Sequence, residues 1–256
     1  QDEKIETVLT VRDNIDEGYL FMATKHGLVK KTPLCEFKNL RKNGLIAINL
    51  RDGDELLKVK VTRGDADIII ATREGNAIRF NETDVRPMGR TASGVKSIHL
   101  KDNDVAVCMD IAVKGEDLLV ISENGFGKRT PITEYKVQRR GGTGLITYKI
   151  SEKTGKVVGA TVCKLDDELM LINTSGVAIR INVSDISVTS RSAMGVTLMR
   201  TSDEEKIAAI AKISGSNEEK EEQLTLEESN EINEIESSSV DIENEVDMVS
   251  DLDDIE

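Results

Sequence analysis

Short β-like runs, rich in apolar residues, recur through the first 216 positions, and they come in pairs separated by a glycine turn. The paired runs are 19–24 with 28–32, 68–72 with 77–80, 118–122 with 127–130, and 169–173 with 177–181. The turn glycines are Gly27, Gly75, Gly125 and Gly176, spaced 48, 50 and 51 residues apart. Because glycine adopts a positive φ without steric cost, each pair predicts a tight β-hairpin.

Each hairpin is followed by a second glycine and two further β-like runs. The second glycines are Gly44, Gly94, Gly144 and Gly195, and the runs that they open are 45–50, 95–100, 145–150 and 196–201. The last runs are 56–61, 105–113, 157–162 and 207–213. Four copies of a four-stranded unit predict an all-β, propeller-like fold with about four complete blades, because one such unit cannot bury its own apolar face.

The periodicity also predicts the organisation of the chain. We expect one repeat domain over 1–216, with repeats at approximately 17–64, 65–114, 115–165 and 166–216. Residues 5–11 alternate like a strand, so we expect 1–16 to be the last strand of an upstream repeat.

Charge is distributed unevenly. The chain has 34 basic and 47 acidic residues, and 17 of the acids lie in 217–256 beside a single lysine, Lys220. The body that remains is slightly basic, with a net charge of +3, whereas the tail carries −16. Dense like charge predicts a disordered tail, which either keeps the protein soluble or competes with another polyanion for the basic body.

The sequence offers no constellation for catalysis or metal binding. The three cysteines are far apart, and neither His26 nor His99 has a second histidine in register, so we expect no metal site, no cofactor and a reduced cytosolic setting. The acidic turns at Asp52 and Asp102 recur in the repeats and are interpreted as Asx turns instead of calcium loops. No apolar run is long enough to cross a membrane.

Basic residues recur at equivalent places in the repeats. A cation stands four residues after each turn glycine, and the loop before each second glycine is basic. The expected DNA-binding cations are Lys30, Lys31, Arg41, Lys42, Arg79, Arg86, Arg90, Lys128, Arg129, Arg139, Arg140, Arg180 and Arg191. A band of lysine and arginine with few aromatics suits the phosphates of double-stranded DNA, and a curved band would bend the duplex.

One loop stands out as Gln138-Arg139-Arg140-Gly141-Gly142-Thr143-Gly144. Paired arginines can bind a phosphate, and glycines let backbone N–H groups approach it closely. We therefore expect this loop to bind DNA also through Gln138, Gly141, Gly142 and Gly144. This heptapeptide resembles the box of the bacterial DNA gyrase A protein, in which lysine stands in place of Thr143. Other stretches resemble the same C-terminal domain, including 21–24, 52–56 and 125–130.

The resemblance covers nearly all of 1–216 and implies a β-pinwheel whose positive outer edge wraps DNA, giving gyrase its negative-supercoiling activity. It implies that this chain is not an enzyme by itself. The cleavage tyrosine and the ATP and Mg²⁺ sites would lie elsewhere in a cytoplasmic, nucleoid-associated A₂B₂ complex with gyrase B. The family box lies in the first blade, so 138–144 in the third repeat is interpreted as a secondary copy.

Two other functions fit the sequence. The equivalent domain of topoisomerase IV guides DNA crossings and has no strong box. A propeller for protein–protein interaction would need exposed aromatic anchors, and this chain has 3 Tyr, 4 Phe and no Trp.

Overall fold

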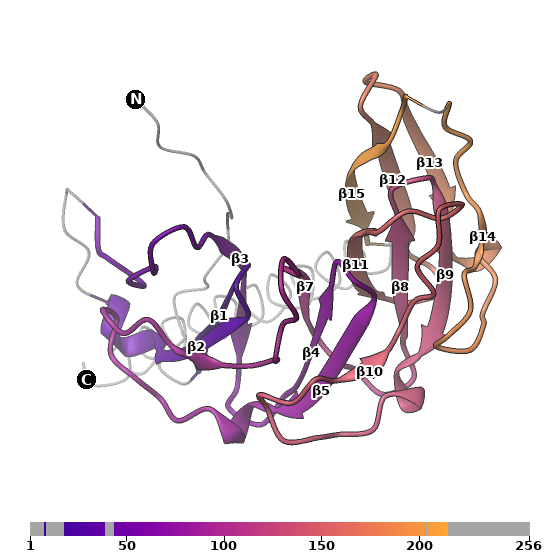
Figure 1. Cartoon of the computed structure of the whole chain (residues 1–256). Coiled ribbons are helices and arrows are strands. Elements are labelled where there is room, and N and C mark those ends of the chain that lie inside the picture. Colours follow the sequence, from indigo (N-terminus) through magenta and orange to yellow (C-terminus); the bar gives the residue numbers. More distant parts are fainter. Residues whose placement is uncertain (1–7, 9–17, 39–43, 203, 215–256) are drawn as a thin grey trace, which may run out of the picture. The chain divides into compact units, whose positions relative to one another are not determined.

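The computed structural model describes residue 8 and residues 18–38, 44–202 and 204–214. These residues form fifteen β-strands and four 3₁₀ helices of three or four residues, which confirms the expected all-β class (Figure 1). None of the described helices has the length and apolar character required to span a membrane. The expected strand at 5–11, the loop residues Arg41 and Lys42 and the acidic tail lie outside the described residues.

The predicted hairpins form the centre of each sheet. They are β1 (Tyr19–Thr24) with β2 (Leu28–Pro33), β4 (Asp67–Thr72) with β5 (Asn76–Asn81), β8 (Asp117–Ser122) with β9 (Phe126–Pro131), and β12 (Glu168–Asn173) with β13 (Ala178–Asn182). The last strand of each repeat pairs antiparallel with the first strand of its hairpin. These inner strands are β3 (Leu56–Thr62), β7 (Ala106–Ile111), β11 (Val157–Cys163) and β15 (Ile207–Ile213).

The fourth strand of a sheet comes from the following repeat, which corrects the expectation of self-contained units. β6 (Val95–Lys96) pairs with β2, β10 (Leu145–Ile146) with β5, and β14 (Val196–Thr197) with β9, as Figure 1 shows for β10 beside β5. The runs 95–100, 145–150 and 196–201, each expected to be a strand of six residues, form strands of only two residues, and 44–50 forms no strand. A glycine precedes each exchanged strand because the backbones approach closely: a Cβ on Gly94 would lie 2.5 Å from the carbonyl oxygen of Val29.

The fourth sheet has three strands, in the order β13-β12-β15. The turn glycines of the first three repeats are covered by the residues that follow an exchanged strand, for example Gly75 by Tyr148. A Cβ on Gly176 would meet nothing within 4 Å. β13 consequently keeps one edge without a partner in the described part of the chain.

Three apolar cores lie between neighbouring sheets. On β4, Ile68 and Ile70 face the core shared with the first sheet, whereas Ile69 and Ala71 face the core shared with the third sheet. The third core packs β8 against β12. A strand buried on both faces reads as a continuous apolar run, which explains why β4 and β8 lack strict alternation.

Candidate nucleic-acid interface

The basic loops and the exchanged strands lie together on one side of each sheet. We call this side the outer edge, and it consists of β6, β10 and β14 with the loops 86–94, 136–144 and 187–195 that lead into them. In each sheet it is the border opposite the inner strand. The backbone of each loop is tied to the preceding repeat through short parallel bridges, Lys31 to Pro87, Arg79 to Val137 and Arg129 to Val188. The fold therefore repeats one loop position three times.

Arg86 and Arg139 present their charge to solvent at the outer edge. Both residues are exposed, and neither guanidinium has a hydrogen bond or ion pair within the described part of the chain. Their positions fit the expected contact with phosphate groups, which require free cations.

Arg90, Arg140 and Arg191 share one register and are half-buried. Arg140 donates from Nε to the carbonyl of Asp84 (3.0 Å) and from Nη1 to the carbonyl of Lys96 (2.9 Å). Arg191 donates from Nη1 to the carbonyl of Ile146 (3.3 Å), and Arg90 lies 4.0 Å from the carboxylate of Glu36. These guanidinium groups brace the loops against a neighbouring repeat and keep part of their surface exposed.

The cation four residues after each turn glycine has a different place from the one expected. Arg129 pairs with Asp117 (2.8 Å) and donates to the carbonyl of Ile186 in the next repeat (2.8 Å). Arg79 pairs with Asp67 (2.7 Å) and donates to the carbonyl of Ile132 (3.1 Å).

Lys31 in the first repeat follows the same pattern. It donates to the carbonyl of Glu82 (3.0 Å) and lies over the ring of Tyr19. The side chains of Lys31, Arg79 and Arg129 are 5%, 16% and 6% exposed, so these three cations join neighbouring repeats and are not available as a surface band. Only Arg180, which binds Glu168, remains largely exposed, at 59%.

Lys30 and Lys128 are also buried, which corrects their assignment as surface cations. The Nζ of Lys128 donates to the carbonyls of Ser190 (2.6 Å) and Arg191 (2.5 Å), and the Nζ of Lys30 binds the carbonyls of Ala47 and Arg90. Burial, reinforced by the neighbouring arginine, lowers the pKa of each lysine to about 8.

The glycines of the 138–144 loop make close contacts and hydrogen bonds with the backbone of the preceding repeat. The N–H of Gly141 (φ +83°) donates to the carbonyl of Ser97 (2.6 Å), so it is not free to bind phosphate as expected. The carbonyl of Gly142 accepts from the N–H of His99 (2.8 Å). Gly144 passes directly against the carbonyl of Ala77, and the backbone N–H of Gln138 donates to the carbonyl of Arg79 (2.8 Å). Arg139 and Thr143 are the exposed residues of this segment, and Arg139 is its exposed cation.

Other exposed cations of this region were missed in the sequence. They are Lys96 on β6, Lys136 at the start of the third-repeat loop, and Lys149 and Arg200 just after β10 and β14. Register was the signal that could have identified them, because Lys136 is equivalent to Arg86, and Lys149 and Arg200 are equivalent to His99.

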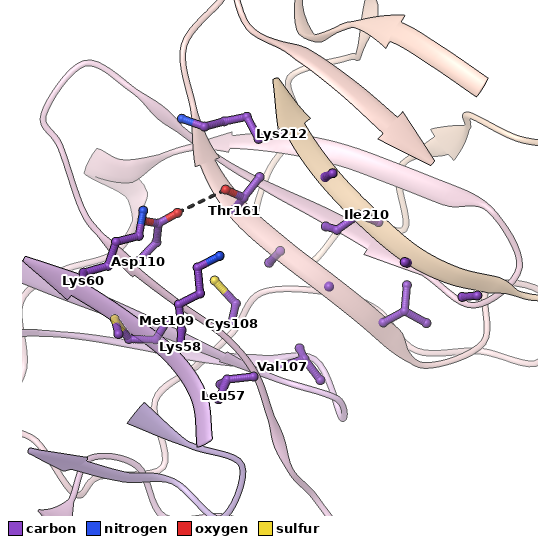
Figure 2. A pocket seen from close by; sticks show the side chains of 16 residues that line it. Leu57, Lys58, Lys60, Val107, Cys108, Met109, Asp110, Thr161, Ile210 and Lys212 are labelled. Atoms are coloured by element: carbon purple, nitrogen blue, oxygen red, sulfur yellow. Dashed lines mark hydrogen bonds and ion pairs between the residues drawn. The ribbon is translucent and has the colours of Figure 1, made fainter. Parts of the chain in front are cut away.

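A cavity of about 840 Å³ lies on the opposite side, between the four inner strands (Figure 2). Asp110 on β7 binds Lys60 on β3 (2.9 Å) and accepts from the hydroxyl of Thr161 on β11 (3.1 Å), so it joins three repeats. Figure 2 shows Lys58 and Cys108 beside this cluster. Burial raises the pKa of the Cys108 thiol far above its usual range, which makes it a poor nucleophile.

The carboxylates of these acidic turns bind differently from the expected Asx turns at Asp52 and Asp102, because the bonds within the described residues are made by Asp54 and Asp104. One carboxylate oxygen of Asp54 accepts from the backbone N–H of His26 and of Glu55, both at 2.9 Å, and Asp104 binds Glu74 and Val105 in the same way. The described residues contain no cluster of three side chains suited to hold a metal ion.

Repeated four-stranded sheets, exchanged outer strands and a cationic outer edge define a propeller-like, repeat-built domain. The chain belongs to the family described as DNA gyrase C-terminal domain, beta-propeller, which matches residues 18–63, 66–107, 116–164 and 167–214.

Relatives and solved structures agree with this family. The gyrase A protein of Clostridium acetobutylicum is 56% identical over 233 residues, which cover 91% of this chain and 28% of the relative. The gyrase A protein of Staphylococcus epidermidis is 44% identical over 216 residues, covering 83% and 24%. The chain thus spans about a quarter of the length of these relatives.

Two solved structures have the same fold. The C-terminal domain of a DNA topoisomerase IV gives a TM-score of 0.82 at 26% identity, covering 90% of this chain and 72% of that one. A DNA gyrase A C-terminal domain gives a TM-score of 0.70 at 28% identity, covering 83% and 75%.

Proposed function

We propose that this chain binds double-stranded DNA along its outer edge without reading sequence, and that it bends and wraps the duplex. The observation that carries the proposal is the repetition of one basic loop in three successive repeats, with Arg86 and Arg139 exposed and unpaired. Evenly repeated cations match a phosphate backbone, whose neutralisation releases counterions. Contacts spread over several repeats can supply the roughly 1–6 kcal/mol that smooth bending of a short duplex costs.

In this proposal the chain performs no chemistry of its own. It would present DNA to a gyrase assembled from two A and two B proteins, an A₂B₂ complex, in the bacterial cytoplasm, and cleavage and ATP hydrolysis would occur in other parts of that complex. The support is membership in the gyrase C-terminal domain family together with the raised pKa values of Cys108 and Cys163, which leave these thiols protonated.

The DNA-guiding role of a topoisomerase IV domain is the second candidate. The TM-score of 0.82 to such a domain favours it, whereas 56% identity to a gyrase A protein and the arginine pair of the 138–144 loop favour wrapping in gyrase. A protein-interaction propeller has less support, because none of the seven aromatic residues is exposed.

Replacing Arg86 and Arg139 by alanine together is expected to weaken duplex binding and to reduce the bend angle. Both residues are exposed and brace no other repeat, in contrast to Arg140, so the fold should be retained. If each arginine neutralises one phosphate, the slope of log K against log salt should become shallower by about 2. Fluorescence anisotropy at several salt concentrations and end-to-end energy transfer on a labelled duplex measure the two effects.

The matched control is Arg63→Ala with Lys114→Ala. It removes the same charge from two exposed residues in the turns that follow β3 and β7, which are not among the strands and loops of the outer edge. Equal losses of affinity in the two double variants would mean that net charge, and not the outer edge, determines binding.

A further inference from the structure

Two lysines reach from one repeat into the basic loop of another. Lys128 extends from β9, and its Nζ donates to two successive carbonyls of the 187–195 loop, those of Ser190 and Arg191. Lys30 holds the equivalent position on β2, and its Nζ binds the carbonyl of Arg90 in the 86–94 loop. Each ammonium group therefore contacts the backbone of the residue that carries an outer-edge guanidinium.

The surroundings of Lys128 tie the same loop at neighbouring points. Tyr148 lies with its ring 5.9 Å from the Nζ of Lys128 and donates from its hydroxyl to the carbonyl of Met194 (2.6 Å). Thr130 donates from Oγ1 to the carbonyl of Thr189 (3.0 Å). Carbonyls at Thr189, Ser190, Arg191 and Met194 are thus bound by side chains from the third repeat, which fixes most of the loop.

The loop at 138–144 is held in place without a buried lysine. Ile78 stands at the position of the two lysines, and its side chain lies beneath Gly142, 3.7 Å from where a Cβ would lie. Backbone hydrogen bonds of Gly141 to Ser97 and of His99 to Gly142 hold this loop. The other two loops have Thr91-Ala92 and Ser192-Ala193 in place of the glycine pair. A buried lysine and a glycine pair are alternative ways to hold the same loop.

We infer that Lys30 and Lys128 are positioning residues of the outer edge: each holds the basic loop of another repeat in place through its backbone, and neither contacts phosphate itself. The link to DNA rests on the proposed function. The anchoring itself rests only on the burial of the two side chains and on their carbonyl partners.

The protonation of these lysines provides a signature of the anchoring. The charged group that faces Lys128 is Arg191, and those that face Lys30 are Arg90 and Glu36. Together with burial they give each lysine a pKa of about 8. When the loop opens, water reaches the amine and its pKa returns toward 10.5. Between about pH 8 and pH 10.5 the lysine therefore binds fewer protons when the loop is closed than when it is open. Closure of the loop consequently becomes more favourable as the pH rises above about 8.

Native-state hydrogen exchange on the whole 256-residue chain tests the anchoring without DNA. Lys128→Met should speed exchange of the 189–194 amides roughly 10-fold, because two loop carbonyls lose their donor, and it should leave 86–94 unchanged. Lys30→Met should have the reverse pattern. The amides of 138–144 serve as an internal control in both variants. Protection of each anchored loop in the unmodified chain should also rise from pH 8 to 9.5, and this rise should be absent from the corresponding variant.

Two results would overturn the inference. One is unchanged exchange in both loops, and the other is equal acceleration throughout the repeats, which would reflect general destabilisation. Duplex affinity then separates anchoring from the proposed function. A loss of duplex affinity of about threefold or more, together with faster loop exchange, supports both the anchoring and the proposed function. A loss of affinity with unchanged exchange indicates that the lysine contacts DNA directly and refutes positioning. Faster exchange with unchanged affinity supports the anchoring and shows that these loops are not part of the DNA surface.

Discussion

Gly125→Ala is expected to separate the third and fourth repeats and to cost at least about 3 kcal/mol of unfolding free energy. Gly125 has φ +74°, a left-handed conformation that costs a residue with a Cβ roughly 1–2 kcal/mol. The added Cβ would also press into the carbonyl oxygen of Met199, which is backbone and cannot turn aside. The carbonyl of Gly125 accepts from the N–H groups of Leu198 (2.8 Å) and Met199 (3.2 Å), so the clash falls where the chain of the next repeat is held.

Gly176→Ala is the matched control for this effect. Gly176 is the equivalent residue of the fourth repeat and has φ +82°, but a Cβ there would meet nothing within 4 Å. Urea unfolding measures the free energy of unfolding of both variants. Gly176→Ala should lower it only by the cost of the left-handed backbone conformation. Gly125→Ala should lower it by that cost and by the further cost of the disrupted inter-repeat contact. Equal losses would indicate that backbone conformation alone determines the effect and that the exchanged strand contributes little.

Removal of residues 217–256 is expected to raise affinity for duplex DNA about 10-fold or more at low salt. The segment carries 17 acids and one base, whereas the remaining 216 residues have a net charge of +3. A polyanion attached to the same chain competes with phosphate for the outer edge and repels DNA at long range. The gain should shrink as salt increases, because screening weakens both effects.

The measurement is duplex affinity across a salt series for the full chain and for the chain ending at Ser216. A third variant, with the acids of the tail replaced by their amides, keeps the length and removes the charge. It should behave like the shortened chain. Identical affinity in all three proteins would reduce the tail to an aid for solubility.

The hairpins and the repeat length were predictable because they depend on local chemistry. Turn glycines and apolar runs act within about a dozen residues, and all four hairpins lie within one or two residues of their expected bounds. The burial of Tyr135 and Tyr148 was also predictable, since each shares its register with apolar residues of the other repeats.

The identity of the surface cations was not predictable to the same degree. Lys128 and Arg129 were both expected at the DNA-binding surface, although adjacent residues of a strand point to opposite faces. Both are buried, because neighbouring sheets cover both faces of β9. Whether a cation binds a carbonyl, a carboxylate or solvent depends on residues far away in the sequence, such as Arg191 for Lys128, 63 positions away, and Ile186 for Arg129, 57 positions away.

By itself the sequence determined an all-β repeat protein with a basic body, an acidic tail and one basic loop per repeat, since hydrophobic periodicity, glycine turns and charge are properties of neighbouring residues. Only the tertiary structure decided which sheet each outer strand joins and which arginines remain free. Strand exchange depends on the close approach of two backbones at Gly94, Gly144 and Gly195, and that approach is created by the packing of one repeat against the next.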